Sequence, residues 1–358
     1  MGEMREKDDG EGMSGTREEL TGVPGLARLV VVDRTGSTND DLRSALTGVD
    51  GRLDLRAAAA WPHISALWAR RQDAGRGRAG RRWITPPGSA LTVSFVLRPL
   101  VPAAALAWLP LLAGLAARDV VDAILISARA PWRARTKWPN DVVLVPNERA
   151  GEGIAAGAST GAGTGGGAGA AAVPVPAEIP GWGRARKVAG VLAELIPTAG
   201  GIGARTSAGT TGTADASGAV AAGADRGAAC AVVLGIGVNT GQSESELPVP
   251  WATSLRLAGA RVEPRALLEL LSARLDELVT AWEAGEGDPD AGDGALGAAL
   301  RRACTTLGRR VRVDAPGGVL RGTAVDIAPG LVLRGADGTM RTVDAGDVSH
   351  VRTDGAVD

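Results

Sequence analysis

Lysines and side-chain amides are scarce in this 358-residue chain, and their positions single out residues that could bind a small polar ligand. Only three of its 39 basic residues are lysines, and two of them lie in the segments Thr136–Asp141 and Arg186–Leu192. Four amides lie beside a glycine, a proline or the end of an apolar run: Asn39, Gln72, Asn140 and Asn239. A lysine ammonium is a compact point charge, and an amide both donates and accepts hydrogen bonds. Unless these residues survive by chance in a sequence biased towards Arg, Ala and Gly, they predict a site for a small polar ligand with an anionic group.

The composition excludes several classes of function. The formal net charge of -1 provides no global basic field for nucleic acid or a membrane surface. Cysteines and histidines are isolated from one another: Cys230, Cys304, His63 and His350. We therefore expect no disulfide scaffold and no metal site built from His or Cys, and a reducing, cytoplasmic compartment. Residues 1–24 are polar, lack the apolar run of a secretion signal and are expected to be disordered.

One uncharged stretch, from Pro99 to Ala117, has the length of a membrane span. It contains two prolines, is mostly Ala and continues as an amphipathic pattern through Asp119 and Asp122. These features favour a buried helix over a membrane segment.

The hydrophobic pattern alternates strands and helices as far as residue 304. Strands are expected at Leu26–Asp33, Ile64–Arg70, Ala90–Leu97, Arg133–Lys137, Asp141–Val145, Lys187–Ile196 and Ala231–Asn239. A helix is expected after Ser37 or Thr38, either of which can cap it, and further helices over 103–124, 264–284 and 295–304.

Two segments, 151–179 and 198–227, consist almost entirely of Gly, Ala, Ser, Thr and Pro and are predicted to be flexible insertions. If the strands on either side of the second segment pair, it is an extended hairpin loop, which loop-closure entropy tolerates. In 305–353, short strands between Pro-Gly and Asp-Gly turns predict a small β-barrel. Because such a short segment makes a marginal core, we expect the barrel to pack on the main domain.

The segment Gly75–Gly80 matches the dinucleotide fingerprint G-x-G-x-x-G, but its context does not. That fingerprint must open a helix, whereas Pro86-Pro87-Gly88 follow here, and no acidic residue lies near position 100 to hold a ribose. The loop instead carries four arginines, Arg76, Arg78, Arg81 and Arg82. Guanidinium groups on a glycine-rich loop suit a polyphosphate or an acyl phosphate. Taken alone, the loop is also compatible with a solvated basic loop or a nucleic-acid contact.

Five ordered motifs resemble those of the biotin protein ligase family: Gly36–Asn39, Gln72–Arg81, Lys137–Asp141, Lys187–Leu192 and Gly235–Asn239. The resemblance covers about residues 25–353 apart from the insertions. It implies an α+β fold, with a mixed sheet and helices in a catalytic domain at 25–304 and an SH3-like barrel at 305–353. It also implies a reaction in which biotin and ATP form biotinyl-5'-AMP and pyrophosphate, followed by transfer of biotin to one lysine of a carrier protein.

The same resemblance implies roles for individual residues. Biotin binding is expected of Ser37, Thr38, Asn39, Gln72, Arg76, Gly77, Arg78, Lys187 and Gly190. Nucleotide binding is expected of Arg78, Arg81, Lys137, Asn140, Asp141 and Asn239. The expected catalytic residues are Lys187 between the biotin carboxylate and the α-phosphate, Asp141 orienting this lysine, and Arg78 in a loop over the adenylate. Mg²⁺ is expected to enter with the ATP phosphates.

The implied partner is the biotin carboxyl carrier protein or domain of an acyl-CoA carboxylase or pyruvate carboxylase, and a weak homodimer is a further expectation. Some family members carry an N-terminal winged helix-turn-helix, but only about 24 residues precede the first expected strand, so DNA binding is not expected. Three alternatives remain, and one of them, a scaffold without catalysis, would require the positions of the rare lysines and amides to be coincidental. A lipoate ligase would carry Arg-Arg, Gly-Gly-Gly and His where this chain has Gly-Arg-Gly-Arg-Ala-Gly-Arg. A nucleic-acid-binding module could use the arginine loop, although the near-neutral charge and 3% aromatic content disfavour it.

Overall fold

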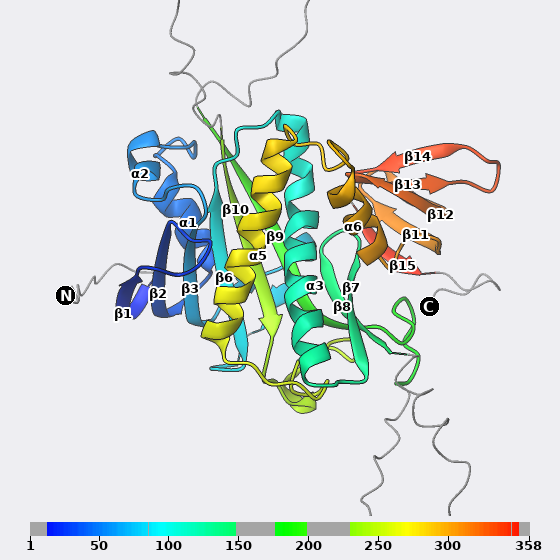
Figure 1. Cartoon of the computed structure of the whole chain (residues 1–358), viewed down its shortest axis with the longest axis horizontal. Coiled ribbons are helices and arrows are strands. Elements are labelled where there is room, and N and C mark those ends of the chain that lie inside the picture. Colours follow the sequence, from blue (N-terminus) through cyan, green and yellow to red (C-terminus); the bar gives the residue numbers. More distant parts are fainter. Residues whose placement is uncertain (1–12, 85, 148–175, 199–229, 345, 351–358) are drawn as a thin grey trace, which may run out of the picture.

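The computed structural model describes residues 13–84, 86–147, 176–198, 230–344 and 346–350. These residues form a large mixed sheet with helices, followed by a smaller antiparallel sheet towards the C-terminus (Figure 1). The expected α+β class is therefore confirmed. Of the two expected insertions, residues 151–175 and 199–227 lie outside the described residues.

The large sheet has eight strands in the order β1-β2-β3-β6-β10-β9-β8-β7. Strands β2 and β3 are parallel, and the other neighbouring pairs are antiparallel. Its strands are β1 (Met13–Leu20), β2 (Arg28–Thr35), β3 (Ser65–Gln72), β6 (Ala90–Leu97), β7 (Trp132–Lys137), β8 (Asp141–Pro146), β9 (Arg186–Pro197) and β10 (Cys230–Asn239). Because β9 and β10 are antiparallel neighbours, the second insertion connects the two strands of a hairpin, as expected.

Strand β1 corrects one prediction. Residues 1–24 were expected to be disordered, but Met13–Leu20 pair with β2 at the edge of the sheet. A bidentate hydrogen bond from Arg28 to Glu19, at 3.1 and 2.9 Å, supports this pairing. An edge strand held by backbone hydrogen bonds and ion pairs does not need a run of apolar residues, so the pattern of the sequence did not reveal it.

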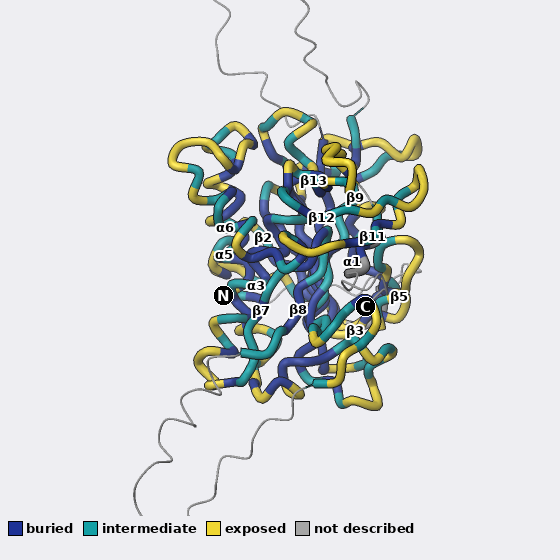
Figure 2. The backbone as a smooth tube through the Cα atoms, turned by 90° about the vertical axis from the view of Figure 1, so that its right-hand side faces the viewer, coloured by how far each residue is buried: buried dark blue, intermediate teal, exposed yellow. Residues whose placement is uncertain are grey.

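Helices cover both faces of the large sheet. On one face, α3 (Leu109–Ser127) and α5 (Pro264–Ala284) bury Leu112 and Leu271 in one cluster with Phe95 of β6. On the opposite face, α1 (Thr38–Leu46) and α2 (Leu55–Ala59) contribute Leu42 and Ala58 to a second, smaller cluster. Figure 2 shows that burial follows the central strands and that the exposed segments are mainly the connecting loops.

The helix expected over 103–124 is interrupted near its start. Ala103–Trp108 form a 3-10 helix, and α3 begins at Leu109 and continues to Ser127. Proline lacks a backbone N–H and is tolerated in the first turn of an α-helix, so Pro110 fits a helix that starts here. As expected, this helix is largely buried, and among the described residues no helix is long and apolar enough to cross a membrane.

The C-terminal sheet has five strands in the order β14-β13-β12-β11-β15. They are β11 (Arg310–Ala315), β12 (Gly318–Ala328), β13 (Gly330–Arg334), β14 (Met340–Val343) and β15 (Asp347–His350), and the last of these was not predicted. Within the described part of this domain, β14 and β15 are edge strands that do not pair with each other. The sheet is therefore open there, and the closed barrel that was expected is not observed.

Ion pairs and apolar contacts hold the smaller sheet against the main domain, as expected from its size. Arg301 of α6 (Ala295–Ala303) donates to both oxygens of Asp290, at 2.6 and 2.8 Å, and to Asp326 of β12, at 2.6 Å. The two carboxylates raise the pKa of Arg301, and Arg301 lowers that of Asp290. Val311 and Ile327 of the smaller sheet also join the cluster under α3 and α5.

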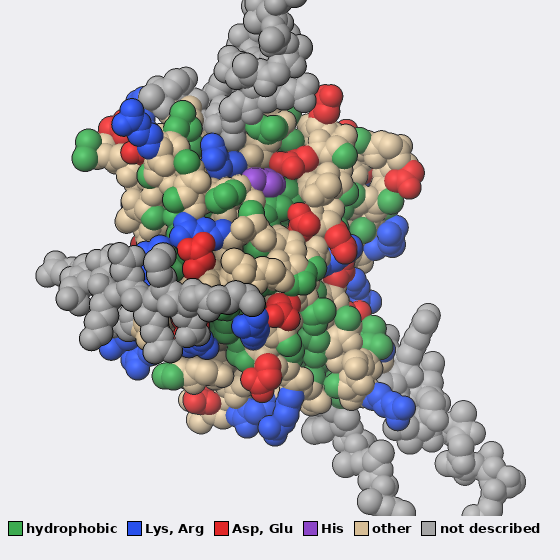
Figure 3. All heavy atoms as spheres, turned by 60° about the vertical axis from the view of Figure 1, so that its left-hand side comes forward, with side chains coloured by type: hydrophobic (Ala, Val, Ile, Leu, Met, Phe, Trp, Pro, Cys, Tyr) green, Lys and Arg blue, Asp and Glu red, His purple; other side chains and the backbone are tan. Residues whose placement is uncertain are grey.

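The face drawn in Figure 3 does not display a continuous basic patch among its described residues. On the face drawn in Figure 3, Lys and Arg side chains are interspersed with Asp and Glu side chains. This arrangement agrees with the near-neutral net charge.

Candidate functional site

A cavity of about 400 Å³ opens on the face of the large sheet that α3 and α5 leave uncovered. Its volume is within the range of small-molecule sites. All the residues predicted to bind biotin line it: Ser37, Thr38, Asn39, Gln72, Arg76, Gly77, Arg78, Lys187 and Gly190. Arg81, Asn140 and Asn239 from the predicted nucleotide set line it as well. Asp141 and Lys137 do not line the cavity.

One end of the cavity is a buried network of hydroxyls and amides. The backbone N–H and the hydroxyl of Thr38 lie 2.9 and 3.2 Å from Gln72 Oε1. Ser94 Oγ lies 2.7 Å from Thr38 Oγ1 and 2.6 Å from Asn39 Oδ1. Of the two caps that the sequence allowed, Ser37 is the one observed, and it caps α1 by accepting a hydrogen bond from the Asp40 N–H at 3.3 Å. The strand-to-helix junction therefore places several polar groups side by side.

Burial raises the pKa of Asp41, in the first turn of α1, while a hydrogen bond from the Thr35 hydroxyl opposes this shift. Asp41 does not line the cavity. It contributes instead to the first turn of the helix that carries Thr38 and Asn39, where a carboxylate is favoured by the helix dipole.

Two glycines of β10 make room for the cavity. A Cβ atom on Gly235 would lie 2.4 Å from Asn39 Oδ1, and one on Gly237 would lie 2.5 Å from the Trp83 ring. Leu234, which precedes Gly235, and Ile236, which lies between the two glycines, join the core under α3 and α5. Strand alternation thus gives β10 one apolar face and one face that ligands and side chains can approach closely.

Lys187 on β9 and Asp141 on β8 form an ion pair, with Nζ 2.5 Å from Oδ1. Their side chains are 23% and 16% exposed, so the pair is shielded without being fully buried. Lys187 Nζ also lies 5.7 Å from the centre of the Trp83 ring. Asp141 does not line the cavity, but its carboxylate can orient Lys187, which does line it.

The arginine loop folds over the same cavity. Gly77 N–H donates to the Arg81 carbonyl at 2.6 Å, and Arg81 N–H donates to the Arg78 carbonyl at 3.2 Å, which closes a tight turn. Strands β4 (Gly75–Arg76) and β5 (Arg82–Trp83) form the base of the loop. The dinucleotide-type helix that the fingerprint would require is not formed, as the sequence context indicated.

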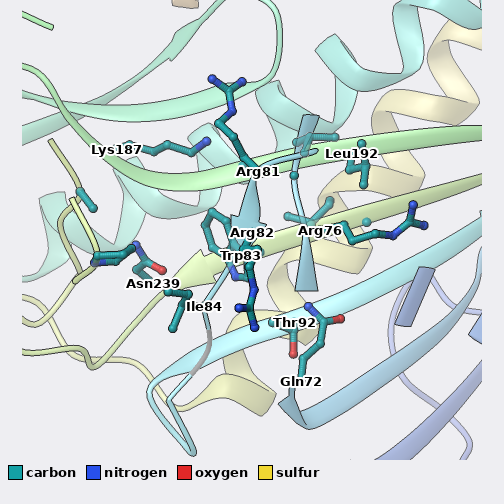
Figure 4. A pocket seen from close by; sticks show the side chains of 18 of the residues that line it. Gln72, Arg76, Arg81, Arg82, Trp83, Ile84, Thr92, Lys187, Leu192 and Asn239 are labelled. Atoms are coloured by element: carbon teal, nitrogen blue, oxygen red, sulfur yellow. The ribbon is translucent and has the colours of Figure 1, made fainter. Parts of the chain in front are cut away.

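The end of the cavity near Lys187 carries a second group of amides. Asn239 Nδ2 donates to the Thr253 carbonyl at 2.9 Å, and Gln242 Nε2 donates to Asn239 Oδ1, also at 2.9 Å. Asn140 Nδ2 donates to the Val191 carbonyl at 2.8 Å. Figure 4 shows Asn239 and Lys187 on one side of Trp83 and Gln72 and Thr92 on the other. The site therefore has two polar ends with one ammonium group near the second.

Lys137 occupies a different place from the one predicted. Its Nζ donates to the Val348 carbonyl of β15 at 2.8 Å and lies 4.0 Å from the centre of the Trp182 ring. Trp182 in turn stacks on Trp251, with ring centres 5.8 Å apart, and Trp251 lines the cavity. Lys137 thus connects the C-terminal sheet to the outer side of the cavity wall.

Several residues of the site were not predicted. Thr92 and Ser94 are the polar residues of the alternating strand β6, and this alternation could have identified them as facing away from the main core. Trp83 and Glu194 carry no comparable signal, because their contacts arise from the packing of distant segments. Among the described residues, no group of three or more His, Cys, Asp or Glu side chains could hold a metal ion.

Comparisons with known proteins agree with this geometry. Residues 53–206 match the family model of the biotin/lipoate A/B protein ligase family, and residues 306–351 match that of the biotin protein ligase C-terminal domain. The biotin–acetyl-CoA-carboxylase ligase of Mycobacterium tuberculosis is 30% identical over 343 residues, covering 94% of each chain. A ligase of the same name from Paracoccus denitrificans is 38% identical over 118 residues, covering 33% of this chain and 42% of its own.

A solved structure supports the fold. A variant biotin protein ligase from Aquifex aeolicus in complex with biotin matches with a TM-score of 0.53 and 20% identity, covering 91% of this chain and 98% of that chain. Fold and site thus define a ligase of the biotin and lipoate type. The chain belongs to the biotin/lipoate A/B protein ligase family, and within it to the biotin protein ligases.

Proposed function

We propose that the protein activates biotin with ATP to biotinyl-5'-AMP and transfers the biotinyl group to a lysine of a biotin carboxyl carrier protein. The observation that carries the proposal is the position of Lys187. Its ammonium, paired with Asp141, lies in one cavity with a buried polar network at one end and a second group of amides at the other.

The chemistry of the first end suits the ureido group of biotin. A ureido group has one carbonyl acceptor and two N–H donors. Because Gln72 Oε1 accepts from Thr38, its Nε2 remains a donor, and Asn39 Oδ1 is an acceptor. The dithiolane ring of lipoate could satisfy neither, so these buried groups would lose hydrogen bonds with that ligand.

Lys187 suits the step that joins the two substrates. A biotin carboxylate oxygen attacks the α-phosphorus of ATP, the new C–O–P bond forms, and the bond to the β-phosphate oxygen breaks to release pyrophosphate. Two anions must approach each other in this step, and a fixed ammonium between them stabilises the charge that develops. Asp141 holds the ammonium in place.

The second step requires no nucleophile from the enzyme. The amine of the carrier lysine attacks the acyl carbon of the mixed anhydride, an amide bond forms, and AMP leaves with the electrons of the broken C–O bond. The arginine loop, with Arg78 and Arg81 at the cavity, is proposed to cover the adenylate until the carrier arrives. In that position the Arg78 guanidinium would lie next to the phosphate of the adenylate.

Mg²⁺ fits this site only as a companion of ATP. Mg²⁺ keeps much of its water and binds through one or two carboxylates and substrate phosphates, so a cage of protein ligands is not required. Asp141 does not line the cavity and is paired with Lys187, so it is proposed to act on the phosphates through that lysine, and the ion would neutralise phosphate charge. Lys137 is no longer proposed as a nucleotide contact, because it lies outside the cavity.

Four finer points belong to the same proposal. The carrier is the biotin carboxyl carrier of acetyl-CoA carboxylase or of pyruvate carboxylase. The C-terminal strands are proposed to belong to an SH3-like barrel. The compartment is the cytoplasm, which agrees with the free, buried thiols of Cys230 and Cys304. The protein is proposed to self-associate as a weak homodimer. It is not proposed to bind DNA.

A two-stage reaction tests the proposal. Purified protein with biotin, ATP and Mg²⁺ should form biotinyl-AMP, detected by mass spectrometry. Addition of a biotin carboxyl carrier domain should then increase the mass of that domain by one biotinyl group, and a carrier whose target lysine is replaced by Arg should not react. Formation of lipoyl-AMP in place of biotinyl-AMP would contradict the proposal.

A further inference from the structure

Glu194 of β9 touches two functional elements without lining the cavity itself. Its Oε2 accepts a hydrogen bond from Asn39 Nδ2 at 2.7 Å. Both of its oxygens lie 3.0 Å from Arg76 Nη2. The side chain of Glu194 is only 19% exposed, so solvent screens these contacts less than it screens a surface pair.

The first contact determines which way the Asn39 amide faces. An ionised carboxylate can only accept hydrogen bonds, so the amide must turn its NH₂ group towards Glu194. Its Oδ1 then faces Ser94 Oγ, at 2.6 Å, and the space that Gly235 leaves free. Without Glu194, Nδ2 would keep only its longer contact with the Leu192 carbonyl, at 3.4 Å, to distinguish the two ends of the amide. Rotation by 180° would then present a donor where the proposed ureido N–H groups need an acceptor.

The second contact ties the arginine loop to the same point. Arg76 also pairs with Asp40 of α1, the helix that carries Asn39. Figure 4 shows Arg76 running past Leu192, with its guanidinium directed away from Lys187. The side chain of Arg76 is 41% exposed, and an ion pair of this kind contributes little to stability. The ion pair of Arg76 with Glu194 therefore fixes the geometry of the loop and contributes little to the stability of the fold.

We propose that Glu194 is a positioning residue for substrate binding: it holds the acceptor face of Asn39 towards the ureido group of biotin and anchors the arginine loop beside it through Arg76. This inference rests on the proposed function, because it takes biotin as the ligand of Asn39. It assigns Glu194 no contact with the substrate.

Calorimetric titration of biotin into three variants tests the assignment. Glu194→Ala should raise the Kd for biotin about tenfold, the loss expected when a hydrogen bond to a charged group no longer orients a binding residue. The KM for ATP should change less than about twofold. Glu194→Gln, which keeps an acceptor for Asn39, should bind biotin almost as tightly as the wild type. Glu277→Ala is the matched control, since Glu277 also pairs with an arginine, Arg274, at 2.8 Å but on α5.

A second set of variants tests whether Glu194 acts through Asn39, and its first two members do not depend on the folding of Glu194→Ala. Asn39→Asp should weaken biotin binding, because two carboxylates then face each other. When Glu194→Gln is added to Asn39→Asp, the Kd for biotin should fall about tenfold. The new amide then donates to the new carboxylate, and an acceptor faces Ser94. In an Asn39→Ala background, replacement of Glu194 by Ala should cause no further loss.

Three results would overturn the inference. The first is a wild-type Kd for biotin in well-folded Glu194→Ala, and the second is a further rise in that Kd when Glu194→Ala is added to Asn39→Ala. The third is a Kd of Asn39→Asp that Glu194→Gln does not improve. Failure of the proposed function has a different signature, because the wild-type protein itself would then not bind biotin.

Discussion

Lys187 reaches Asp141 by lying across Gly190, the residue that pairs with Asp141 in the register of β8 and β9. A Cβ atom on Gly190 would lie 3.1 Å from Lys187 Nζ, so the absence of a side chain lets the lysine lie along the strand. The carboxylate of Asp141 thus holds the ammonium at the cavity, and the absence of a side chain on Gly190 leaves the space that the lysine occupies.

Replacement of Lys187 should therefore abolish activation more than binding. In Lys187→Ala, adenylate formation should fall by about two to three orders of magnitude or more, because the charge that pairs the two anions is lost. The melting temperature should stay within a few degrees of the wild type, because the side chain is not part of the apolar core. Single-turnover formation of biotinyl-AMP measures the effect, and near-normal rates would remove Lys187 from the catalytic role.

Addition of one methyl group at Gly237 should reshape the cavity. The new Cβ of Gly237→Ala would lie 2.5 Å from the Trp83 ring, so the ring must move. We expect the KM for biotin or ATP to rise about tenfold or more, since a displaced ring changes the middle of the cavity. Gly317→Ala is the matched control, because nothing lies within 4 Å of its Cβ position. Equal kinetics in the two variants would show that Trp83 does not shape the site.

Ser94 should matter for biotin and not for ATP. Ser94→Ala removes the hydroxyl between Thr38 and Asn39 and leaves buried acceptors with one partner fewer. The KM for biotin should rise about tenfold, with the KM for ATP changed less than about twofold. Ser65→Ala, which removes another buried hydroxyl from β3, should leave both constants unchanged. An equal effect on both substrates would contradict the assignment of this end to biotin.

Arg301 should contribute a pH-dependent stability. Because Arg301 lowers the pKa of Asp290 below its ordinary 3.8, the pair stabilises the folded state above that value and loses this contribution as the pH falls through the lower folded pKa. Arg301→Gln should lower the free energy of unfolding by about 1 to 2 kcal/mol near pH 7, a small value because both side chains are partly exposed.

Urea denaturation at a series of pH values measures this effect. The difference between the wild type and Arg301→Gln should be constant from neutral pH to about pH 5 and should shrink below about pH 4. A difference that does not change with pH would indicate that Arg301 acts through packing alone.

Elements with strong local patterns could be predicted from the sequence. The alternation in 90–97 and the leucine stripe of 264–284 gave the observed bounds of β6 and α5. Strands β1 and β15 were missed because they are edge strands, held by backbone pairing and not by an apolar pattern. The bounds of α3 depended on the 3-10 turn before Pro110, which periodicity does not distinguish from an α-helix.

The residues of the candidate site also divide into those that a local sequence pattern predicted and those that only the tertiary fold brings together. Ordered motifs at strand ends placed Ser37 to Asn39, Gln72 and Lys187 around one cavity, because strand ends at one side of a sheet meet in space. Lys137 was misplaced because it is close to Asp141 in sequence, whereas its side chain turns towards β15. Glu194 was missed because its partners Asn39 and Arg76 are brought to it only by the tertiary fold.

The most direct test of the central claim is exchange of radiolabelled pyrophosphate into ATP, catalysed by the purified protein with Mg²⁺ in the presence of biotin, of lipoate, or of neither. Exchange should depend on biotin and should be lost in Lys187→Ala. Exchange with lipoate alone, or no exchange with either acid, would contradict the central claim.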